Sequence, residues 1–446
     1  MTIGRPFLPK NMKNKFIALL KQEVKPALGC TEPIAVALAV ARSCELLRSI
    51  SQEPDHIDVK VSGNILKNGM GVGIPGTNGM VGLHIAAALG CTCGNSAYCL
   101  EVLKEVDEES LARAQEMVSA GCITISLAET GEKLYVSAEA RSSSGKESHK
   151  ALAIISGSHD SIVCEELNDK LISSIEKSNN ENPTDNLIEP DFARKITIEQ
   201  ILDFATHTPF EELEFIMDSV TLNKALVDEG LRKEYGLQVG RRLLAPENLS
   251  VFGDNHLTYA MAYTAAASDA RMAGSTLPAM SNSGSGNQGI TATVPIIAIA
   301  EKLEVNHEEL VRALVISHLI AIHIKGHLGR LSALCGCVVA STGSACGIVY
   351  LRKGGYEQMC AAIKNMIGNI TGMVCDGAKV GCALKVASGV ASAIQSAVLA
   401  LDDISISSND GIIEEDIEKT IANLGRIGSV GMQATDDMIL DIMVCK

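Results

Sequence analysis

The sequence predicts an α+β N-terminal domain followed by an all-α C-terminal domain. Segments with the alternating apolar pattern of β-strands occur only in the first part of the chain, beginning with HIDVKVS at 56–62. Beyond residue 190, apolar residues recur almost everywhere at helical spacing. Between these parts lies 173–190, a polar, asparagine-rich stretch bounded by proline, which is typical of a linker. We therefore expect two domains, residues 1–190 and residues 191–446.

The first elements in chain order are helical. Residues 11–50 show helical periodicity that is interrupted near Pro26 and resumes at Thr31. A threonine followed by glutamate and proline suits a helix start, because these residues cap or favour the positive end of a helix. Cys30 then lies just before that helix, where the helix dipole is expected to lower the pKa of its thiol.

The next elements are expected to form a sheet. The strand at 56–62 leads into a glycine-rich loop, Gly63 to Gly76, and a helix over about 79–89. CITISLA at 122–128 and KLYVSAEA at 133–140 are separated by ETGE, which predicts a hairpin. A further strand is expected within 146–156.

Composition excludes several classes of protein. The 446 residues include 38 Lys+Arg against 53 Asp+Glu, for a net charge of −15, and 46% of the residues are hydrophobic. Such an acidic chain lacks the basic surface that binds nucleic acid or anionic membranes, so we expect neither partner. The longest credible membrane span, 331–351, is rich in Gly, Ser and Thr and is expected to be a buried segment instead.

Fourteen cysteines are the unusual feature of the composition. The N-terminal sequence MTIGRPFLPKNMKNKF contains no apolar signal segment, so we expect a cytoplasmic protein without a disulfide framework. Cys335, Cys337 and Cys346 lie on a Gly/Ser-rich segment, and Cys375 and Cys382 follow around a turn. Close zinc-type pairs are absent from this spacing. It fits an iron–sulfur cluster about as well as a set of buried structural cysteines.

Two glycine motifs are candidate binding loops. Neither GVGIPG at 71–76 nor GSGNQG at 284–289 directly follows a strand, so a dinucleotide-binding fold is not expected. The second motif runs into an apolar helix, whose start suits a small anion such as a carboxylate. Candidate ligands for a substrate carboxylate or amine therefore come from the two glycine-rich segments: Asn64, Lys67, Ser281, Asn282, Ser283 and Asn287.

Five stretches together resemble the L-cysteine desulfidase family, and the C-terminal half is more distantly similar to the α region of iron–sulfur L-serine dehydratases. They are GCTEPIAVALA at 29–39, SGNILKNGMGVGIPG at 62–76, MAGSTLPAMSNSGSGNQGI at 272–290, LSALCGC at 331–337 and GMVCDGAKVGCALK at 372–385. The resemblance covers nearly the whole chain in matching order. It implies an all-α C-terminal catalytic domain of the iron–sulfur serine dehydratase type. It also implies a [4Fe–4S] cluster held by three cysteines, and breakdown of L-cysteine to pyruvate, ammonia and sulfide without pyridoxal phosphate.

Site residues follow from the matching motifs. The resemblance makes Cys375 and Cys382 two cluster ligands and one cysteine of LSALCGC the third. Cys335 is preferred for that position, with Cys337 and Cys346 as open alternatives. Three further residues are expected to contact substrate: Thr31 and Glu32, next to Cys30 in the GCTEP motif, and His327, which lies one turn after His323. Cys445, the penultimate residue, is an open candidate for the remaining iron.

The expected chemistry requires loss of the Cα proton and departure of sulfide. An open iron suits the carboxylate and the soft sulfur leaving group, and Cys30 is the expected base. Two alternatives remain at this stage: an L-serine dehydratase with the same cluster, and a non-catalytic protein that senses cysteine or metal. The expected partners are a small amino-acid substrate and, as an open alternative to a monomer, a second copy of the chain in a homodimer.

Overall fold

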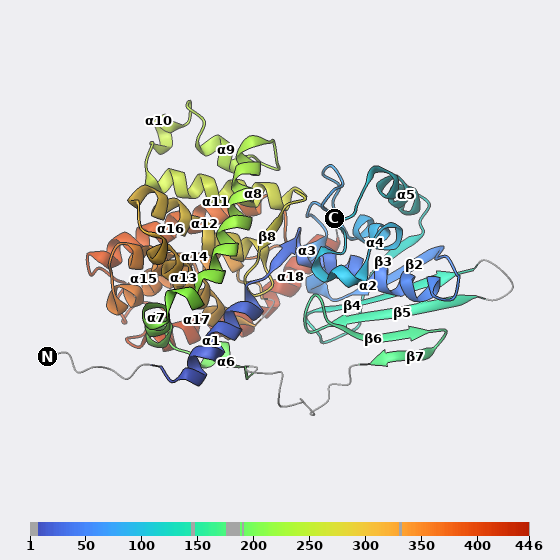
Figure 1. Cartoon of the computed structure of the whole chain (residues 1–446), viewed down its shortest axis with the longest axis horizontal. Helices are drawn as coiled ribbons and strands as arrows, with labels where there is room; N and C mark the ends of the chain where they lie inside the picture. Colours follow the sequence, from blue (N-terminus) through green and yellow to red (C-terminus); the bar gives the residue numbers. More distant parts are fainter. Residues whose placement is uncertain (1–7, 144–147, 175–187, 190, 330–331, 446) are drawn as a thin grey trace.

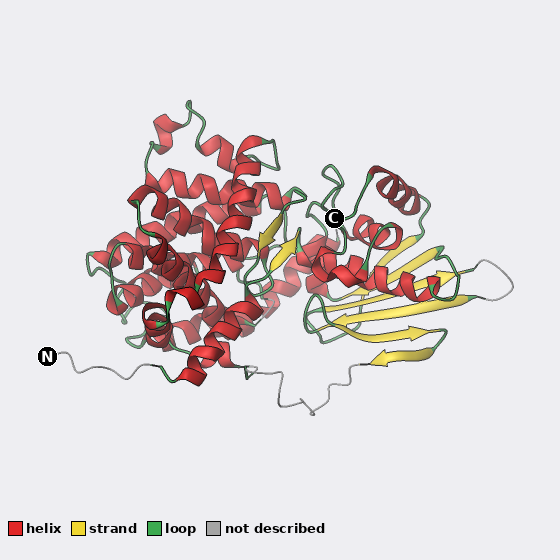
Figure 2. Ribbon diagram, viewed as in Figure 1, coloured by secondary structure: helices red, strands yellow, loops and turns green. Residues whose placement is uncertain are grey.

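The computed structural model describes residues 8–143, 148–174, 188–189, 191–329 and 332–445. Its helices gather on one side and a six-stranded sheet with its own helices lies on the other (Figures 1 and 2). The α+β N-terminal part and the largely helical C-terminal part are therefore confirmed. Most of the expected linker, 175–187 and Pro190, lies outside the described residues.

The sheet has the strand order β3-β2-β4-β5-β6-β7. Its strands are β2 (His56–Val61), β3 (Ile123–Leu127), β4 (Tyr135–Ser142), β5 (His149–Ser156), β6 (Ile162–Leu167) and β7 (Lys170–Ser174). The strand expected within 146–156 is confirmed as β5, whereas β6 and β7 were not predicted. The hairpin prediction was wrong, because β2 lies between β3 and β4, parallel to the first and antiparallel to the second. Ile57, Val59 and Val61 of β2 are buried, which explains why this strand takes the interior position.

Helices cover one face of the sheet. α2 (Thr31–Arg48) packs on β4 and β5, and α4 (Leu83–Thr92) packs on β3 and α2, with α5 (Glu108–Ser119) beyond it. Two boundaries differ from the sequence prediction. The segment expected as a glycine-rich loop begins with a short helix, α3 (Gly63–Gly69), and α4 starts four residues later than expected because Gly79 and Gly82 adopt positive φ.

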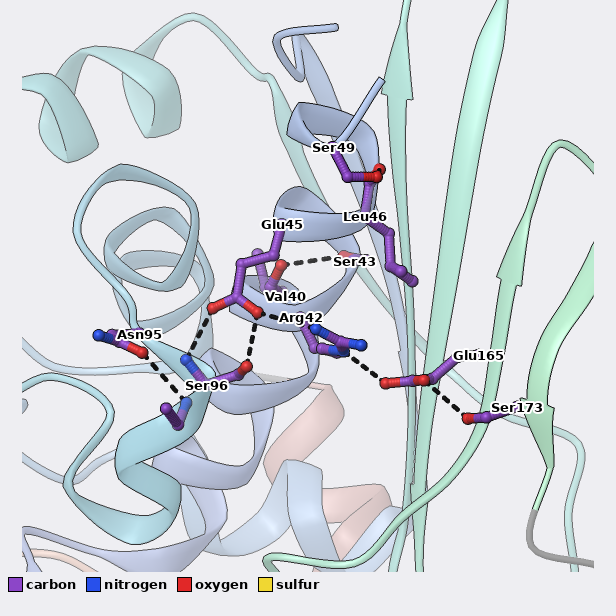
Figure 3. A network of polar contacts seen from close by, with 11 residues as sticks. Val40, Arg42, Ser43, Glu45, Leu46, Ser49, Asn95, Ser96, Glu165 and Ser173 are labelled. Atoms are coloured by element: carbon purple, nitrogen blue, oxygen red, sulfur yellow. Dashed lines mark hydrogen bonds and ion pairs between the residues drawn. The ribbon is translucent and has the colours of Figure 1, made fainter. Parts of the chain in front are cut away.

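A polar network holds α2 to the sheet and to the 3₁₀ helix η1 (Ser96–Glu101), as Figure 3 shows. Arg42 of α2 forms an ion pair with Glu165 of β6, and that carboxylate accepts a 2.7 Å hydrogen bond from Ser173 of β7. Glu45 of α2 accepts hydrogen bonds of 2.8 and 2.5 Å from the backbone N–H and hydroxyl of Ser96. These contacts fix the orientation of α2, whose N-terminus carries Cys30.

The helical part is built around α13 (His307–Leu328), which is buried along most of its length and packs against α14. The other described helices of this part are α1 (Lys10–Glu23), α6 (Phe192–Lys195), α7 (Ile198–His207), α8 (Met217–Arg232), α9 (Val239–Leu243), α10 (Leu249–Phe252), α11 (His256–Met272), α12 (Gly286–Leu303), α14 (Gly336–Leu351), α15 (Tyr356–Ile370), α16 (Cys382–Leu401), α17 (Ile417–Arg426) and α18 (Gln433–Val444), with short 3₁₀ turns η2 (Phe210–Glu212) and η3 (Glu214–Ile216) and the π-helical turn η4 (Ile427–Gly431).

The two parts are joined near the N-terminus of the chain. Phe16 and Leu20 of α1 belong to the same core as the C-terminal helices, so α1 packs outside the core of the sheet although it precedes the proposed boundary at residue 190. After α1, β1 (Pro26–Leu28) pairs antiparallel with β8 (Pro278–Met280). This two-stranded ladder places Cys30 beside the segment that begins α12.

Two helices of the described part are long and apolar enough to cross a membrane, α13 and α16. Within the structure, 78% of the apolar window of α13 and 50% of that of α16 are buried against other elements. Such burial is typical of core helices, which pass the same test of length and composition. Within the segment at 331–351, which the sequence singled out for its length, Gly336–Leu351 forms the shorter buried helix α14, and Leu331 lies outside the described residues.

Candidate functional site

The N-termini of four helices meet at one cavity of about 130 Å³. We call it the cysteine cavity and define it by six lining residues, Cys30, Arg271, Cys335, Cys375, Cys382 and Lys385. Cys30 is the N-cap of α2, Ser285 that of α12, Cys335 that of α14, and Cys382 is the first residue of α16. A helix N-terminus carries partial positive charge and unpaired N–H groups, so four of them together favour an anionic ligand.

Cys30 and Glu32 form the most direct contact in this cavity. The Cys30 thiol donates a 2.9 Å hydrogen bond to Oε2 of Glu32, and Thr31 donates 3.0 and 3.2 Å hydrogen bonds to the carbonyl of Gly284 and to the same carboxylate oxygen. Burial, and then the Glu32 charge, raise the pKa of Cys30 well above its usual value. The expectation that the helix dipole would lower this pKa was therefore wrong, because burial and a neighbouring carboxylate outweigh it.

Glu32 stays ionised beside this thiol. Burial opposes its ionisation, but His159, the Cys30 hydrogen bond and Arg271 together hold the pKa of Glu32 below its ordinary value. The site thus contains a thiol that donates to a carboxylate, and both residues line the cavity.

The three predicted cluster ligands line the same cavity from two adjacent segments. The backbone N–H of Cys335 donates to the carbonyl of Met373 at 3.0 Å, and that of Cys375 donates to Ala333 at 2.6 Å. Cys382 follows after the turn at Gly377, which has a positive φ of 92°. Burial and the neighbouring thiols raise the pKa of Cys335. The three sulfurs are therefore close enough to influence one another electrostatically.

No three His, Cys, Asp or Glu side chains of the described residues meet around a point where a single metal ion could bind. A cluster has a different requirement, because each thiolate binds a different iron. The donor set that lines the cavity, three cysteines from separate positions, suits that arrangement better than a mononuclear site.

The alternative cysteines differ in their contacts. Cys337 also lines the cavity, but its thiol donates to the carbonyl of Lys385 at 3.1 Å, and burial raises its pKa to about 11. Cys346 lies further along α14, fully buried, with the carbonyl of Met359 at 3.8 Å. Cys445 is exposed at the end of α18 and does not line the cavity.

Two lysines face the cysteines. Lys385 of α16 donates to the carbonyl of Val374 at 2.8 Å and pairs with Asp376. Although burial opposes it, that carboxylate raises the pKa of Lys385, which therefore stays charged. Lys325 of α13 also lines the cavity, and burial lowers its pKa to about 8. Positive charge beside three thiols fits a site for an anionic group.

Several lining residues were missed by sequence analysis. Arg271 and Gln288 are buried, and Asn68 and His159 reach the cavity from α3 and from the loop between β5 and β6. Arg271 had a detectable signal, because it is a single basic residue near the end of the alanine-rich pattern of α11. His159 had none, since only the fold brings its loop to the α12 start.

The structure brings some predicted substrate ligands together and separates others. Thr31, Glu32, Ser283 and Asn287 line the cysteine cavity. Four of the predicted residues lie elsewhere, namely Asn64, Lys67, Ser281 and His327, and Asn282 lies behind the cavity wall, where it binds His318 and Gln288. Ser281 donates to the carbonyl of Lys25 at 2.6 Å, next to the β1–β8 ladder. His327 packs against Gly425 of α17.

Asn64 and Lys67 line a second cavity of about 320 Å³, together with Asp436 of α18. We call it the lysine cavity. Lys67 is buried and pairs with Asp436, and the carbonyl of Lys67 lies 2.4 Å from the position of a β-carbon on Gly377. Thus α3 separates the two cavities, and Ser332 is the residue that borders both.

Comparison with known proteins identifies relatives along the full chain. The family described as serine dehydratase alpha chain matches residues 97–441, a span that includes five of the six sheet strands as well as the helical part. A UPF0597 protein of Bacteroides thetaiotaomicron is 48% identical over 435 residues, which cover 97% of this chain and 98% of the relative. UPF0597 proteins of Oleidesulfovibrio alaskensis and Shewanella baltica are 48% and 46% identical over 97% and 96% of this chain, and over 98% of each relative. The chain therefore belongs to the UPF0597 family and to the wider serine dehydratase alpha chain family.

Proposed function

We propose that the protein is an iron–sulfur-dependent lyase that cleaves L-cysteine to pyruvate, ammonia and sulfide. The observation that carries this proposal is the convergence of Cys30 with Cys335, Cys375 and Cys382 on one small cavity formed by helix N-termini. Membership of the serine dehydratase alpha chain family supports a lyase of this general type. The preference for L-cysteine rests on the resemblance of the GCTEP and CDGAKVGC motifs to the desulfidase family.

The residues present fit a [4Fe–4S] cluster held by Cys335, Cys375 and Cys382. Cys335 is favoured over Cys337 as the third ligand, because the Cys337 thiol already donates to a backbone carbonyl. When bound, such a cluster supplies an iron without a protein thiolate, a Lewis acid suited to a soft sulfur leaving group. Lys325 and Lys385 supply positive charge that offsets the negative charge of the thiolates.

Cys30 is proposed as the base and Glu32 as the group that orients its thiol. The 2.9 Å hydrogen bond aligns the thiol with the ionised carboxylate, and loss of the thiol proton to water leaves a thiolate facing the cavity. The thiolate takes the Cα proton of L-cysteine, the C–H electron pair forms the Cα–Cβ double bond, and the C–S bond breaks to release hydrosulfide. The remaining aminoacrylate tautomerises to an imine, which water hydrolyses to pyruvate and ammonia without further help from the protein. No pyridoxal phosphate is needed in this scheme.

L-Serine dehydration is the second candidate, and the family match to serine dehydratase alpha chains favours it. The same residues would act, with hydroxide rather than hydrosulfide leaving. The two substrates differ in one atom, so a direct comparison of kcat/KM for L-cysteine and L-serine decides between them.

The test is anaerobic purification and reconstitution with iron and sulfide, followed by parallel assays of sulfide and pyruvate. We expect a brown protein with iron and sulfide contents near cluster stoichiometry, and pyruvate formed together with sulfide. Pyruvate from L-serine alone would reassign the substrate. Cluster binding without pyruvate from either amino acid would favour the non-catalytic sensing protein, and absence of both cluster and pyruvate would remove the lyase proposal.

A cytoplasmic location and a homodimer are further proposals that follow from the sequence. Size-exclusion chromatography with light scattering measures the second of these directly.

A further inference from the structure

We infer that Arg271 and Gln288 form a recognition pair for the two charged groups of an α-amino acid in the cysteine cavity, Arg271 for the α-carboxylate and Gln288 for the α-ammonium group. This inference rests on the proposed function, since it concerns the substrate of the same cavity. It assigns substrate contacts to two residues that neither the sequence analysis nor the proposed chemistry used.

Arg271 is a buried cation with unused hydrogen-bonding capacity. It is 3% exposed and lines the cavity, and its Nε has no hydrogen-bond partner among the described residues. Its Nη1 donates to Oδ1 of Asn287 at 3.2 Å and contacts the sulfur of Met272 at 3.3 Å. Glu32 is the carboxylate whose pKa Arg271 helps to lower, but it accepts its hydrogen bonds from Cys30 and Thr31. Arg271 has no hydrogen bond to a carboxylate among the described residues, so its burial is costly, and a bound carboxylate would reduce that cost.

The start of α12 is shaped around this guanidinium. A β-carbon at Gly286, the first residue of that helix, would lie 2.1 Å from Nε of Arg271 and 2.5 Å from its Cζ. Only a glycine therefore lets the guanidinium lie against the positive end of an 18-residue helix. The unpaired N–H groups of the first turn and the guanidinium then favour the same kind of ligand, a small anion.

Gln288 is the counterpart of Arg271, because it carries a buried hydrogen-bond acceptor that lacks a donor. It is 1% exposed, and its Oε1 has no hydrogen-bond partner among the described residues. Its Nε2 donates to Oδ1 of Asn282 at 2.8 Å, and Nδ2 of Asn282 donates to the carbonyl of His318 at 3.2 Å. Because that backbone carbonyl can only accept, the chain of contacts fixes both amides. Oε1 lies 3.1 Å from the position of a β-carbon on Gly336, at the start of α14.

A zwitterionic α-amino acid satisfies both groups at once, because its carboxylate and ammonium are attached to one carbon. Arg271 and Gln288 line one cavity of about 130 Å³, so one small molecule can contact both side chains. The binding free energy would therefore come mainly from the two charged ends, and the cysteines would meet the β-substituent. A ligand that lacks either end leaves one buried polar group unpaired, which is the basis of strong discrimination.

The experiment uses the anaerobically reconstituted full chain and three unreactive ligands. L-Alanine has both charged ends and no leaving group, 3-mercaptopropionate lacks the ammonium group, and cysteamine lacks the carboxylate. Calorimetric titration gives Kd for each ligand with the wild-type protein and with Arg271→Gln and Gln288→Met. Arg113→Gln, an exposed arginine on α5, is the matched control.

Arg271→Gln should weaken L-alanine and 3-mercaptopropionate by about 10- to 100-fold and leave cysteamine within about two-fold. Gln288→Met should weaken L-alanine and cysteamine and leave 3-mercaptopropionate unchanged. The control should change none of them. If Arg271→Gln does not fold, Gly286→Ala provides the second variant, because its methyl group displaces the guanidinium and should give the same pattern.

Equal weakening of all three ligands by Arg271→Gln would overturn the inference, since Arg271 would then act only as a general positive charge. Absence of L-alanine binding to the wild-type protein would overturn it as well. The outcome is separable from the proposed function. If the protein binds L-alanine through Arg271 but forms no pyruvate, the recognition pair stands and the lyase proposal fails. If the protein forms pyruvate and neither substitution changes KM, the lyase proposal stands and the recognition pair fails.

Discussion

The two cavities beside α3 differ in how their buried polar groups are satisfied. The lysine cavity is larger, about 320 Å³ against 130 Å³, but its buried cation Lys67 is already paired with Asp436. In the smaller cysteine cavity, Nε of Arg271 and Oε1 of Gln288 have no partner among the described residues. An unsatisfied buried group is costly, and a bound ligand that supplies the missing partner removes that cost. This difference favours the smaller cavity as the site of the proposed ligand.

The largest effect is expected from loss of a cluster ligand. Cys375→Ala removes one of the three thiolates, so we expect no brown chromophore after reconstitution, iron far below cluster stoichiometry and no pyruvate from L-cysteine. Visible absorbance with iron and sulfide analysis measures the first two quantities. Cys360→Ala, a buried cysteine on α15 outside the cavity, is the matched control and should keep its cluster. A Cys375→Ala protein with a full cluster would show that the ligand set is wrong.

Removal of the proposed base should be the next largest effect. Cys30→Ala deletes the only thiol of the cavity that donates to a carboxylate in the described structure, so kcat should fall by about 10²- to 10⁴-fold while the chromophore remains. The two measurements are stopped-time pyruvate assays and visible absorbance on the same sample. Loss of the chromophore together with activity would instead make Cys30 a fourth ligand, and full activity would refute its role as base.

The sequence predicted the architecture well where periodicity decides it. The change from alternating to helical pattern near residue 190 corresponds to the change from sheet to helices. Strand pairing was not predictable in the same way. The short link between β3 and β4 favoured a hairpin, but pairing also depends on how much of each strand is buried, and three residues of β2 are buried against one of β3.

The site was predicted in part, and the residues show why. Cys30 and the cluster cysteines stand in distinctive motifs, so the sequence could single them out. Lys67 stands in such a motif too, yet its ion pair with Asp436 joins residues 369 positions apart, and no local pattern shows such a pairing. The pKa of Cys30 was misjudged for the same reason. The helix dipole is a local property, whereas burial and the contact with Glu32 depend on the packed site.

The pH dependence of kcat/KM tests whether Glu32 controls the ionisation of the Cys30 thiol. The Glu32 charge and hydrogen bond help to raise the pKa of Cys30, so the wild-type profile should rise with pH as the thiol ionises. In Glu32→Gln that charge is gone, so the pKa of Cys30 falls and the rise should occur at lower pH. The maximum should be about 10- to 100-fold lower, because the charged hydrogen-bond acceptor that aligns the thiol is lost. A rise displaced to higher pH would contradict the arrangement, and Glu53→Gln on the surface of the chain should leave the profile unchanged.

The smallest effect on activity is expected from the lysine cavity, where the effect should appear in stability. Lys67→Met keeps the buried stem but leaves Asp436 without its partner. The free energy of unfolding should fall by roughly 1–3 kcal/mol, less than for a fully buried pair because the Asp436 side chain is 21% exposed. Urea denaturation measures this change, and the double variant Lys67→Met/Asp436→Leu should recover part of it, since both charges are then removed.

KM for L-cysteine should stay within about two-fold of wild type, because Lys67 does not line the cysteine cavity. A large rise in KM with unchanged stability would restore Lys67 as a substrate ligand and move the binding site toward the larger cavity.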